Sequence, residues 1–219
     1  MRWARKTMFD AIRQDYSASR ARWPFNALTL AYRALQDAGF RAMMFYRLGR
    51  WGRRRRMRLL ALLSERAMHH LCQVWISTEA NIGPGLRIAH VCGIVIPPGT
   101  VIGRNCEIRQ NVTLGGNFGK LSPEGRANPR LGDNVSLGPG CVLLGPIEVG
   151  DNSVIGANAV LTQSVPPDSV VAGWRDEIVA TREADGSMVR SVPNVYLSRR
   201  ELYERLESMQ QRLDSVEKV

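Results

Sequence analysis

Histidine, cysteine and long apolar runs are all scarce in this chain of 219 residues. There are three histidines, and only His90 lies beyond residue 76. No stretch reaches the roughly 18 uninterrupted apolar residues that a membrane-spanning helix needs, and residues 1–6 carry charge without the apolar core of a secretory signal. The four cysteines are too far apart for a zinc ribbon or a Cys-X-X-Cys pair, which favours reduced thiols in a cytoplasm.

Charge and glycine are unevenly distributed along the chain. Residues 1–75 contain sixteen Lys and Arg against four Asp and Glu, a net +12, whereas residues 76–219 contain fourteen against sixteen, a net −2. Sixteen of the 20 glycines fall between Gly83 and Gly173. The whole-chain charge of +10 therefore averages a basic first third and a nearly neutral remainder.

An aliphatic residue recurs every six positions in the second half of the chain. The register holds without a slip through Leu131, Leu137, Leu143, Val149, Ile155 and Leu161. Small or β-branched residues follow each of them after four positions, namely Val135, Cys141, Ile147, Ser153, Ala159 and Val165. Six residues match one short strand and a corner, so three units close a triangular coil. Stacked coils bury a continuous aliphatic column, which predicts a parallel β-helix rather than a sandwich, whose pattern alternates every two residues.

The same period appears upstream in two other phases, carried by Ile82, Ile88, Ile94 and then by Ile102, Ile108, Leu114. Two insertions account for the changes of phase. We place a two-residue insertion at the Pro97-Pro98 turn and a longer excluded loop, rich in Gly and Pro, at residues 116–130.

The motifs of the repeat region are Ile88-Ala89-His90, Asn111-Val112-Thr113-Leu114-Gly115-Gly116, the excluded loop, Ile155-Gly156-Ala157 and Val165-Pro166-Pro167. With them, residues 82–173 resemble the hexapeptide-repeat acyltransferases. The region is most similar to the serine acetyltransferase branch, which includes O-acetyltransferases of capsule and exopolysaccharide synthesis. The resemblance implies a left-handed parallel β-helix, a homotrimer, and acetyl-CoA bound in the groove between neighbouring subunits.

An acetyl transfer to a hydroxyl needs a base, donors for the thioester oxyanion and a groove for the pantetheine arm. The resemblance assigns the base to His90, since imidazole accepts and returns protons near neutral pH. It assigns the cofactor contacts to Asn111, Gly115, Gly116, Gly138, Gly156 and Ala157. Lys120, Arg126 and Arg130 are candidates to pair with CoA phosphates. Without the resemblance, a lone histidine is more often structural, and a Gly-Gly pair marks a turn as readily as a binding surface.

Three positions depart from the family on the acceptor side. Trp75 and Ala89 replace family Asp residues, the first of which helps to orient the base, and Asn128 replaces a second histidine in the loop. The cofactor half of the pattern is retained and the amino-acid half is not, which disfavours serine as the acceptor. Glu79 and Glu107 are the candidates to orient His90.

The first 76 residues lack the six-residue period, and their pattern predicts helices. Residues 26–47 place apolar residues at helical spacing, six arginines follow between Arg50 and Arg58, and residues 59–76 are amphipathic. Basic amphipathic helices with Trp are typical of proteins that bind anionic membrane surfaces. The alternative is a solvated basic surface on an oligomer-forming cap. Nucleic acid would suit the same charge, but no recognition motif supports it.

The C-terminal residues predict a helix. Ser198-Arg199-Arg200-Glu201 is a capping box. Beyond it, apolar residues follow the spacing of a coiled-coil seam at Leu202, Leu206, Met209, Leu213 and Val216. A helix packed on its own subunit is the alternative. Residues 174–197 read as a connecting segment with a hairpin.

The sequence thus predicts a mainly β chain in three parts: a basic α-helical region (1–76), a left-handed β-helix acyltransferase domain (77–173), and a connecting segment with a C-terminal helix (174–219). The preferred function is acetyl-CoA-dependent O-acetylation of a sugar hydroxyl of an exopolysaccharide or its lipid-linked precursor. The expected place is the cytoplasm, peripheral at the inner face of the cell membrane. The alternatives are L-serine O-acetylation and a non-catalytic scaffold with a membrane-docking cap. A β-helix carbonic anhydrase holds zinc with three histidines, so no metal is predicted.

Overall fold

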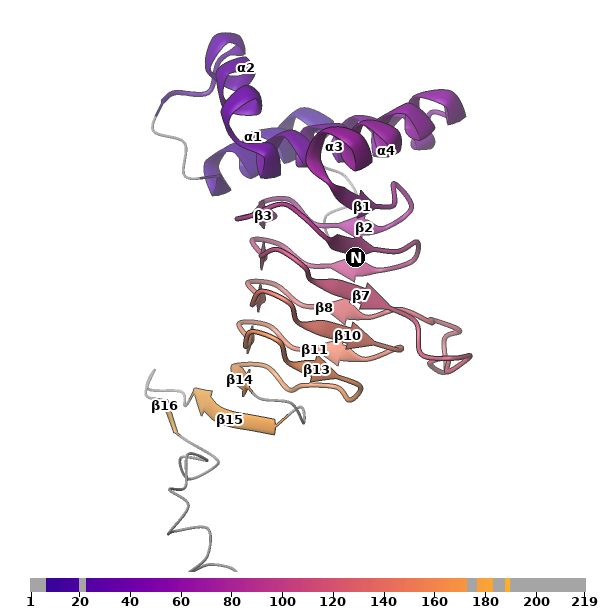
Figure 1. The fold of residues 1–219 in the computed structure, drawn as a ribbon, viewed down its shortest axis with the longest axis vertical. Helices are drawn as coiled ribbons and strands as arrows, with labels where there is room; N and C mark the ends of the chain where they lie inside the picture. The colour runs from indigo at the N-terminus through magenta and orange to yellow at the C-terminus, as the bar shows by residue number, and fades with distance from the viewer. Residues whose placement is uncertain (1–6, 20–22, 173–176, 183–187, 190–219) are drawn as a thin grey trace, which may run out of the picture.

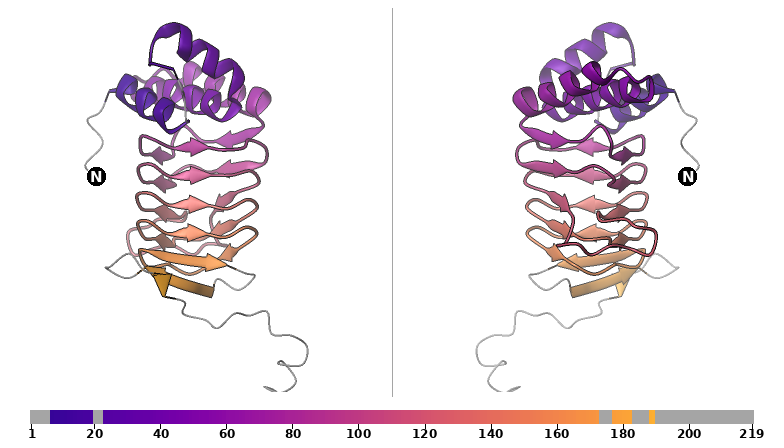
Figure 2. Two further views of the ribbon diagram at one scale, coloured as in Figure 1. Left: turned by 90° about the vertical axis from the view of Figure 1, so that its left-hand side faces the viewer. Right: turned by 90° about the vertical axis from the view of Figure 1, so that its right-hand side faces the viewer.

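The computed structural model describes residues 7–19, 23–172, 177–182 and 188–189 (Figure 1). Four helices come first, namely α1 (Met8–Ala18), α2 (Ala27–Gln36), α3 (Ala38–Arg54) and α4 (Arg58–Cys72). They lie across one end of a stack of short strands, as both side views also show (Figure 2). The predicted coiled-coil helix after residue 198 falls outside the described residues.

The strands of the stack form three parallel sheets. Sheet A contains β1 (Val74–Ile76), β4 (Ile94–Ile96), β7 (Thr113–Gly115), β10 (Val142–Leu144) and β13 (Val160–Leu161). Sheet B contains β2 (Asn81–Ile82), β5 (Val101–Ile102), β8 (Arg130–Leu131) and β11 (Glu148–Val149). Sheet C contains β3 (Arg87–Ile88), β6 (Glu107–Ile108), β9 (Ser136–Leu137), β12 (Val154–Ile155) and β14 (Ser169–Ala172). Because successive strands pass from A to B to C and back to A, the chain winds as a three-sided parallel β-helix.

The aliphatic column predicted from the six-residue period is the core of this β-helix. All six residues from Leu131 to Leu161 are at most 2% exposed. The small residues four positions later are also buried, at most 6% exposed. Each buried aliphatic side chain stabilises the fold by about 1.5–3 kcal/mol relative to an exposed one, so the column as a whole explains why the coils stack. The predicted β-helix fold is confirmed.

The two-residue insertion lies elsewhere than the sequence suggested. Ile76, Ile82 and Ile88 fill the inward positions of the first coil, six residues apart. Ile96 pairs with Ile76 and is therefore the next inward position, eight residues after Ile88. The two extra residues belong to the corner between β3 and β4, which contains His90. The placement at the Pro97-Pro98 turn is wrong by one corner.

The excluded loop is present where it was expected. Residues 116–129 join β7 to β8, which occupy neighbouring sides of the third coil. Asn128 donates a hydrogen bond from Nδ2 to the carbonyl of Pro98 at 2.6 Å and so ties the base of the loop to the coil above.

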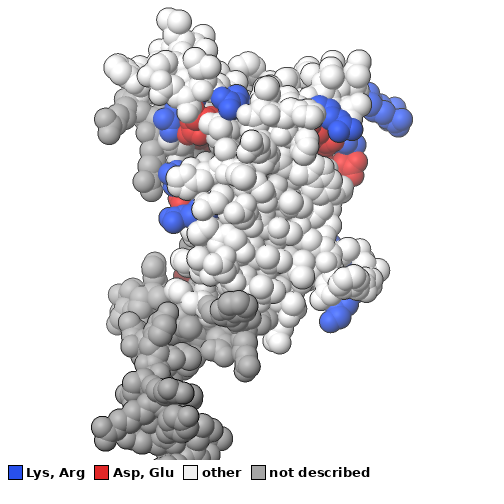
Figure 3. Space-filling model, viewed as in Figure 1, with Lys and Arg blue, Asp and Glu red and all other residues white. Residues whose placement is uncertain are grey.

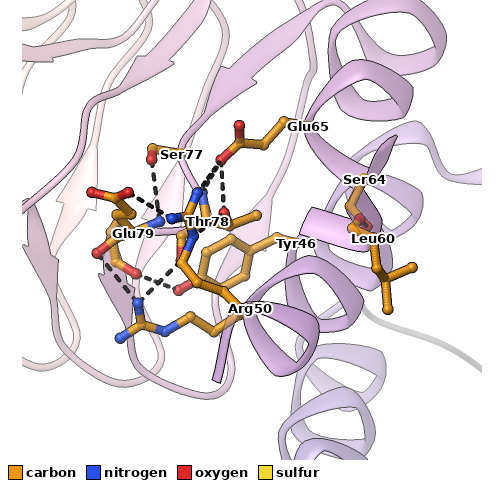
Figure 4. Close-up of polar contacts among 10 residues, drawn as sticks. Tyr46, Arg50, Leu60, Ser64, Glu65, Ser77, Thr78 and Glu79 are labelled. Carbon is orange, nitrogen blue, oxygen red and sulfur yellow. Dashed lines mark hydrogen bonds and ion pairs between the residues drawn. The ribbon is translucent and has the colours of Figure 1, made fainter. Parts of the chain in front are cut away.

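The helices close the open end of the β-helix. The strands β1 to β3 have no coil above them, so their backbone groups need partners from elsewhere. Tyr46 on α3 donates from its hydroxyl to the carbonyl of Ala80 at 2.8 Å and accepts from the amide of Ile82 at 3.1 Å. Glu65 on α4 accepts from the amide of Thr78 at 2.7 Å (Figure 4). Side chains of the helices thus take the place of the missing coil.

A buried ion pair completes this closure. Arg47 donates to the carbonyls of Ile82 and Gly83, each at 2.7 Å, and forms an ion pair with Asp15 at 2.8 Å. Asp15 in turn accepts from the amide of Gly85 at 2.8 Å. The two charged side chains are only 7% and 1% exposed. Part of the basic charge of the N-terminal third therefore holds the helices to the first coil.

The helical region differs from the prediction at two points. The helix expected over residues 26–47 is broken at Asp37, whose side chain accepts from the amide of Phe40 at 2.9 Å and so begins α3. The helix expected over residues 59–76 ends at Cys72, because Gln73 adopts a left-handed conformation (φ 54°) and the chain then enters β1. The β-helix therefore begins at Val74, inside the predicted helical region. Strands β15 (Glu177–Arg182) and β16 (Met188–Val189) pair antiparallel where a hairpin was expected.

Candidate active site

His90 lies in the widened corner between sheets C and A of the first coil. Before it, the amide of Ala89 donates to the carbonyl of Ile108 at 2.9 Å, and after it the amide of Gly93 donates to the carbonyl of Gln73 at 3.1 Å. The corner is thus anchored on both sides while its middle is free to bulge. The side chain of His90 is exposed and has no hydrogen-bond partner among the described residues. It is available to a ligand.

Two left-handed residues return the chain from this bulge into β4. Cys92 has φ 94° and Gly93 has φ 65°. The positive φ of Gly93 favours glycine, and a Cβ atom there would lie 2.3 Å from Oδ1 of Asn111 in the coil below, so that side chain would have to move. Asn111 itself is left-handed (φ 58°) and exposed, which is why an Asn occupies this corner. The predicted cofactor residue Asn111 therefore also has a structural reason to be present.

The predicted cofactor glycines fall into two physically different groups. A Cβ atom on Gly138 would lie 2.7 Å from the amide nitrogen of Ala157, and one on Gly156 would lie 3.0 Å from the carbonyl of Val171. Close stacking of the coils requires glycine at both places. Gly115 and Gly116 are different. A Cβ atom added to them would have its nearest neighbour 3.4 and 3.6 Å away, respectively, and neither residue has a positive φ. Neither steric crowding nor backbone strain requires glycine at these two positions, so their uncovered backbone is available to a ligand.

These residues lie along both edges of sheet A. His90, Asn111, Gly138, Gly156 and Ala157 follow one another down the corner between sheets C and A. Gly115 and Gly116 lie at the opposite edge, where β7 leaves for the excluded loop. One chain does not bring the two groups together, since the strands of sheet A separate them.

Neither acidic residue proposed to orient His90 contacts it. Glu79 lies at the corner between sheets A and B, and its carboxylate pairs with Arg53 at 2.7 Å. Glu107, on the outer face of sheet C, pairs with Arg87 at 2.5 Å and with Arg109 at 3.4 Å. Burial raises the pKa of the Glu107 carboxyl, but the hydrogen bond and charge of Arg87 outweigh it and leave the pKa below its usual value. Both carboxylates therefore form ion pairs with arginines, and the sequence alone did not predict these pairs.

Gln110 is a residue near His90 that the sequence reading missed. Gln110 lies in the equivalent corner of the coil below, two residues after Ile108, which pairs with Ile88. The amide of Asn111, the next residue, donates to the carbonyl of Cys92 at 2.8 Å. The Oε1 atom of Gln110 is buried and has no hydrogen-bond partner among the residues described. A buried acceptor without a partner is uncommon, because leaving it unpaired costs about 1–3 kcal/mol. The only sequence signal for it is its place two residues after an inward isoleucine, the same place that His90 has.

The basic residues of the loop are separate from this corner. Arg126 and Arg130 line a cavity of about 920 Å³ between loop residues 122–126 and the outer face of sheet B, and His90 is not among its lining residues. Arg126 pairs with Glu148 at 2.7 Å, while its Nη1 is buried without a partner among the described atoms. Lys120 is exposed on the loop. No group of three or more His, Cys, Asp or Glu in the described part of the chain could hold a metal ion.

Comparisons with known proteins find matches to part of the repeat region and to most of the chain. Residues 128–163 match the model of the bacterial transferase hexapeptide (six repeats). The serine acetyltransferase of Mycobacterium tuberculosis is 37% identical over 172 residues, which cover 78% of this chain and 73% of that protein. This chain belongs to the serine acetyltransferase family. The family's enzymes are acyltransferases built on the left-handed β-helix.

Other members of the serine acetyltransferase family extend the comparison. The Escherichia coli (strain K12) serine acetyltransferase is 38% identical over 147 residues, 67% of this chain and 53% of that one, so this chain spans about half the length of that relative. The structure of Neisseria gonorrhoeae serine acetyltransferase in complex with serine has a TM-score of 0.67 at 30% identity and covers 78% of this chain and 68% of that chain. A serine acetyltransferase complex with CoA has a TM-score of 0.66 at 32% identity, over 78% and 69%.

Proposed function

We propose that this protein transfers the acetyl group of acetyl-CoA to a hydroxyl, with His90 as the general base. The observation that carries the proposal is the exposed, unpartnered imidazole on a corner widened by two residues. His90 takes the proton of the acceptor hydroxyl as its oxygen attacks the thioester carbonyl, and it gives that proton to the CoA thiolate as the thiolate leaves. Backbone amides of the Gly115-Gly116 stretch are the candidates to donate to the oxyanion.

The cofactor groove forms between two copies of the chain in this proposal. The residues predicted to contact CoA lie on opposite edges of sheet A, so a neighbouring copy must bring its Gly115 edge to the His90 corner. The bare backbone at Gly115 and Gly116 suits the close approach of a thin pantetheine arm. The related structure in complex with CoA supports this choice of cofactor.

A homotrimer around sheet A is the assembly that we propose. The outward residues of sheet A are uncharged, namely Trp75, Val95, Thr113, Val142 and Val160. Sheets B and C instead present charged residues such as Arg130, Glu148 and Glu107. Figure 3 shows that the middle of the coil face turned to the viewer carries no charged side chains, which lie at its edges and at the junction with the helices. An uncharged sheet face is the one that three copies can bury at least cost in desolvation.

L-serine is the acceptor that the comparisons favour. The matched relatives are named serine acetyltransferases, and one related structure contains serine. The preference for a sugar hydroxyl of an exopolysaccharide rests on Trp75, Ala89 and Asn128 and on the basic, aromatic-rich N-terminal region. Asn128 is occupied by its bond to Pro98, and Trp75 is 48% exposed on sheet A. We therefore propose serine first, and a sugar hydroxyl as the competing acceptor.

The test is CoA release from acetyl-CoA with L-serine, free sugars and nucleotide sugars. We expect turnover with one acceptor class and a loss of about 10²–10⁴-fold in His90→Gln, with CoA binding retained by calorimetry. His70→Gln is the matched control, since His70 is exposed at the end of α4. Full activity in His90→Gln contradicts the assigned base. No CoA binding by the wild-type protein favours the scaffold alternative.

Docking of the helical cap on an anionic membrane is a second proposal, favoured by one observation. Leu59, Leu62 and Leu63 on α4 are 69%, 48% and 57% exposed, and they follow directly after the exposed arginines of the turn between α3 and α4. None of the described helices is both long and apolar enough to cross a membrane. Co-sedimentation with phosphatidylglycerol vesicles should fall when the three leucines become serine. Equal sedimentation of both proteins would count against docking.

A further inference from the structure

We propose that the junction between the helices and the first coil contains a binding site for a phosphate-type oxyanion. A cavity of about 80 Å³ opens between α1, α3 and β2. Its walls include Thr7 and Met8 at the start of α1, Arg50, Trp51 and Arg54 on α3, and Asn81 on β2. The described residues that line it include no Asp or Glu. The site is separate from the His90 corner, which lies on the other side of the first coil between sheets C and A.

Two arginines of the cavity, Arg50 and Arg54, have no carboxylate partner among the residues that the structure describes. Arg50 donates only to neutral oxygens, the carbonyls of Thr78 and Glu79 at 3.1 and 3.3 Å and Oδ1 of Asn81 at 3.5 Å. The side chain of Arg54 has no hydrogen bond or ion pair within the described part of the chain. Arg50 is half-buried and Arg54 is exposed. A half-buried cation without a counter-charge is costly, and an anion held between the two arginines removes that cost.

Two neighbouring arginines of α3, in contrast, each form an ion pair with a carboxylate. Arg47 is paired with Asp15 at 2.8 Å, and Arg53 is paired with Glu79 at 2.7 Å. Burial lowers the pKa of Arg50, and the charges of Arg54, Arg53 and Arg47 lower it further, outweighing the opposite effect of Tyr46. Positive charge is therefore in excess at the Arg50 guanidinium.

The start of α1 adds to the positive potential. Its positive dipole end lies at the cavity, where Thr7 is the N-cap and the first amides of the helix have no helical acceptors. Asp10 opposes this in part, because its carboxylate accepts from the amide and hydroxyl of Thr7 at 3.2 and 2.7 Å. Residues 1–6, which precede Thr7, contain three basic residues and no acidic one.

Size and geometry select the class of ligand. A volume of about 80 Å³ accommodates one tetrahedral oxyanion. Guanidinium groups bind phosphate or sulfate through two parallel N–H donors, which a chloride ion cannot use. The oxyanion is either free in solution or the phosphate of a lipid head group, and both would bridge α1 to α3.

Thermal unfolding tests the site with inorganic phosphate as the probe. Phosphate titrated against chloride at constant ionic strength should raise the Tm of the wild-type protein in a saturable way, by about 2–4 °C when its concentration is about five times Kd. Arg54→Gln should lose this response, since Arg54 lines the cavity and makes no other described bond. Arg66→Gln, which removes an exposed arginine of α4 outside the cavity, should keep it. Acetyl transfer should be unchanged in Arg54→Gln. A missing phosphate response therefore argues against the oxyanion site alone, and missing acetyl transfer argues against the proposed function alone.

Vesicles distinguish the two sources of the phosphate. Saturable stabilisation by inorganic phosphate, with vesicle binding unchanged in Arg54→Gln, identifies a free oxyanion. Loss of binding to phosphatidylglycerol vesicles in Arg54→Gln but not in Arg66→Gln identifies a lipid head group. If Arg54→Gln responds like the wild-type protein to both probes, or if phosphate does no more than chloride, the site does not exist.

Discussion

Ile88 and Ile96 fill successive inward positions of the β-helix, yet eight residues separate them where six are the rule. The surplus lies in the corner that contains His90. Both ends of that corner are tied by backbone hydrogen bonds, so the extra length forms a bulge, in which Val91 packs against the core and His90 is exposed. The candidate base is therefore presented by an irregularity of the repeat, not by the repeat itself.

Deleting Val91 and Cys92 should restore a regular corner and abolish activity. Gly93 would then follow His90 at the left-handed place that Asn111 holds in the coil below. We expect the fold to be retained with a lower Tm, because the packing of Val91 against the core is lost, and kcat/KM lower by at least ~100-fold, because the imidazole no longer reaches the acceptor. Circular dichroism and the coupled assay measure the two effects. An active deletion variant would show that the bulge does not position His90.

Two glycine substitutions should separate coil stacking from cofactor binding. Gly138→Ala should destabilise the fold by about 1–3 kcal/mol, since its Cβ atom would lie 2.7 Å from the amide nitrogen of Ala157. Gly116→Ala should change stability by less than ~0.5 kcal/mol but raise the KM for acetyl-CoA about tenfold, a cost of ~1.4 kcal/mol. Urea unfolding and steady-state kinetics give both numbers. An unchanged KM in Gly116→Ala would remove that residue from the cofactor groove.

Breaking the buried ion pair of the cap should destabilise the protein strongly. Asp15→Ala leaves Arg47 charged and only 7% exposed, which costs about 3–5 kcal/mol. It also removes the acceptor for the amide of Gly85. Arg13→Ala, a charge change on the same helix, serves as the control and should stay within ~0.5 kcal/mol. Equal unfolding midpoints for the two variants would contradict the role given to the pair.

Gln110 should act as a positioning residue for His90. Its unpaired Oε1 lies one coil below and can accept from an imidazole N–H, so Gln110→Ala should lower kcat about tenfold, or ~1.4 kcal/mol in activation free energy. Gln110→Glu should restore much of the rate but move the rising limb of the pH profile to higher pH, because a carboxylate favours the protonated imidazole. A merely structural residue would change the Tm and leave the pH profile in place. Identical pH profiles for all three proteins would therefore exclude the positioning role.

The repeat was predictable from sequence because one residue type marks every inward position. Its single misplaced insertion has a physical cause in β4, where Ile94 and Ile96 both point inward. Counting six from Ile88 therefore reaches an acceptable aliphatic residue at Ile94, and only strand pairing identifies Ile96 as the true successor. The site assignments had a similar limit, since they located His90 but could not show what surrounds it.

The carboxylates illustrate what a sequence without structure cannot reveal. Glu79 and Glu107 were reasonable candidates as acidic residues of the first two coils, but Arg53 and Arg87 lie 26 and 20 residues away in sequence and engage them. In the same way, the arginines near the end of α3 read as a uniform basic surface. In the structure, some of these arginines bond to the first coil, and others are exposed to solvent.

The two ends of the β-helix differ from each other and from its middle. At one end, Tyr46, Arg47 and Glu65 occupy backbone groups that another coil would otherwise use. At the other, β14 pairs with β15 in the antiparallel sense, which a parallel coil cannot continue. A bare coil at either end would be a template for adding a second molecule in the same register. The terminal elements thus restrict growth along the axis, which favours the proposed side-by-side association of copies over end-to-end fibres.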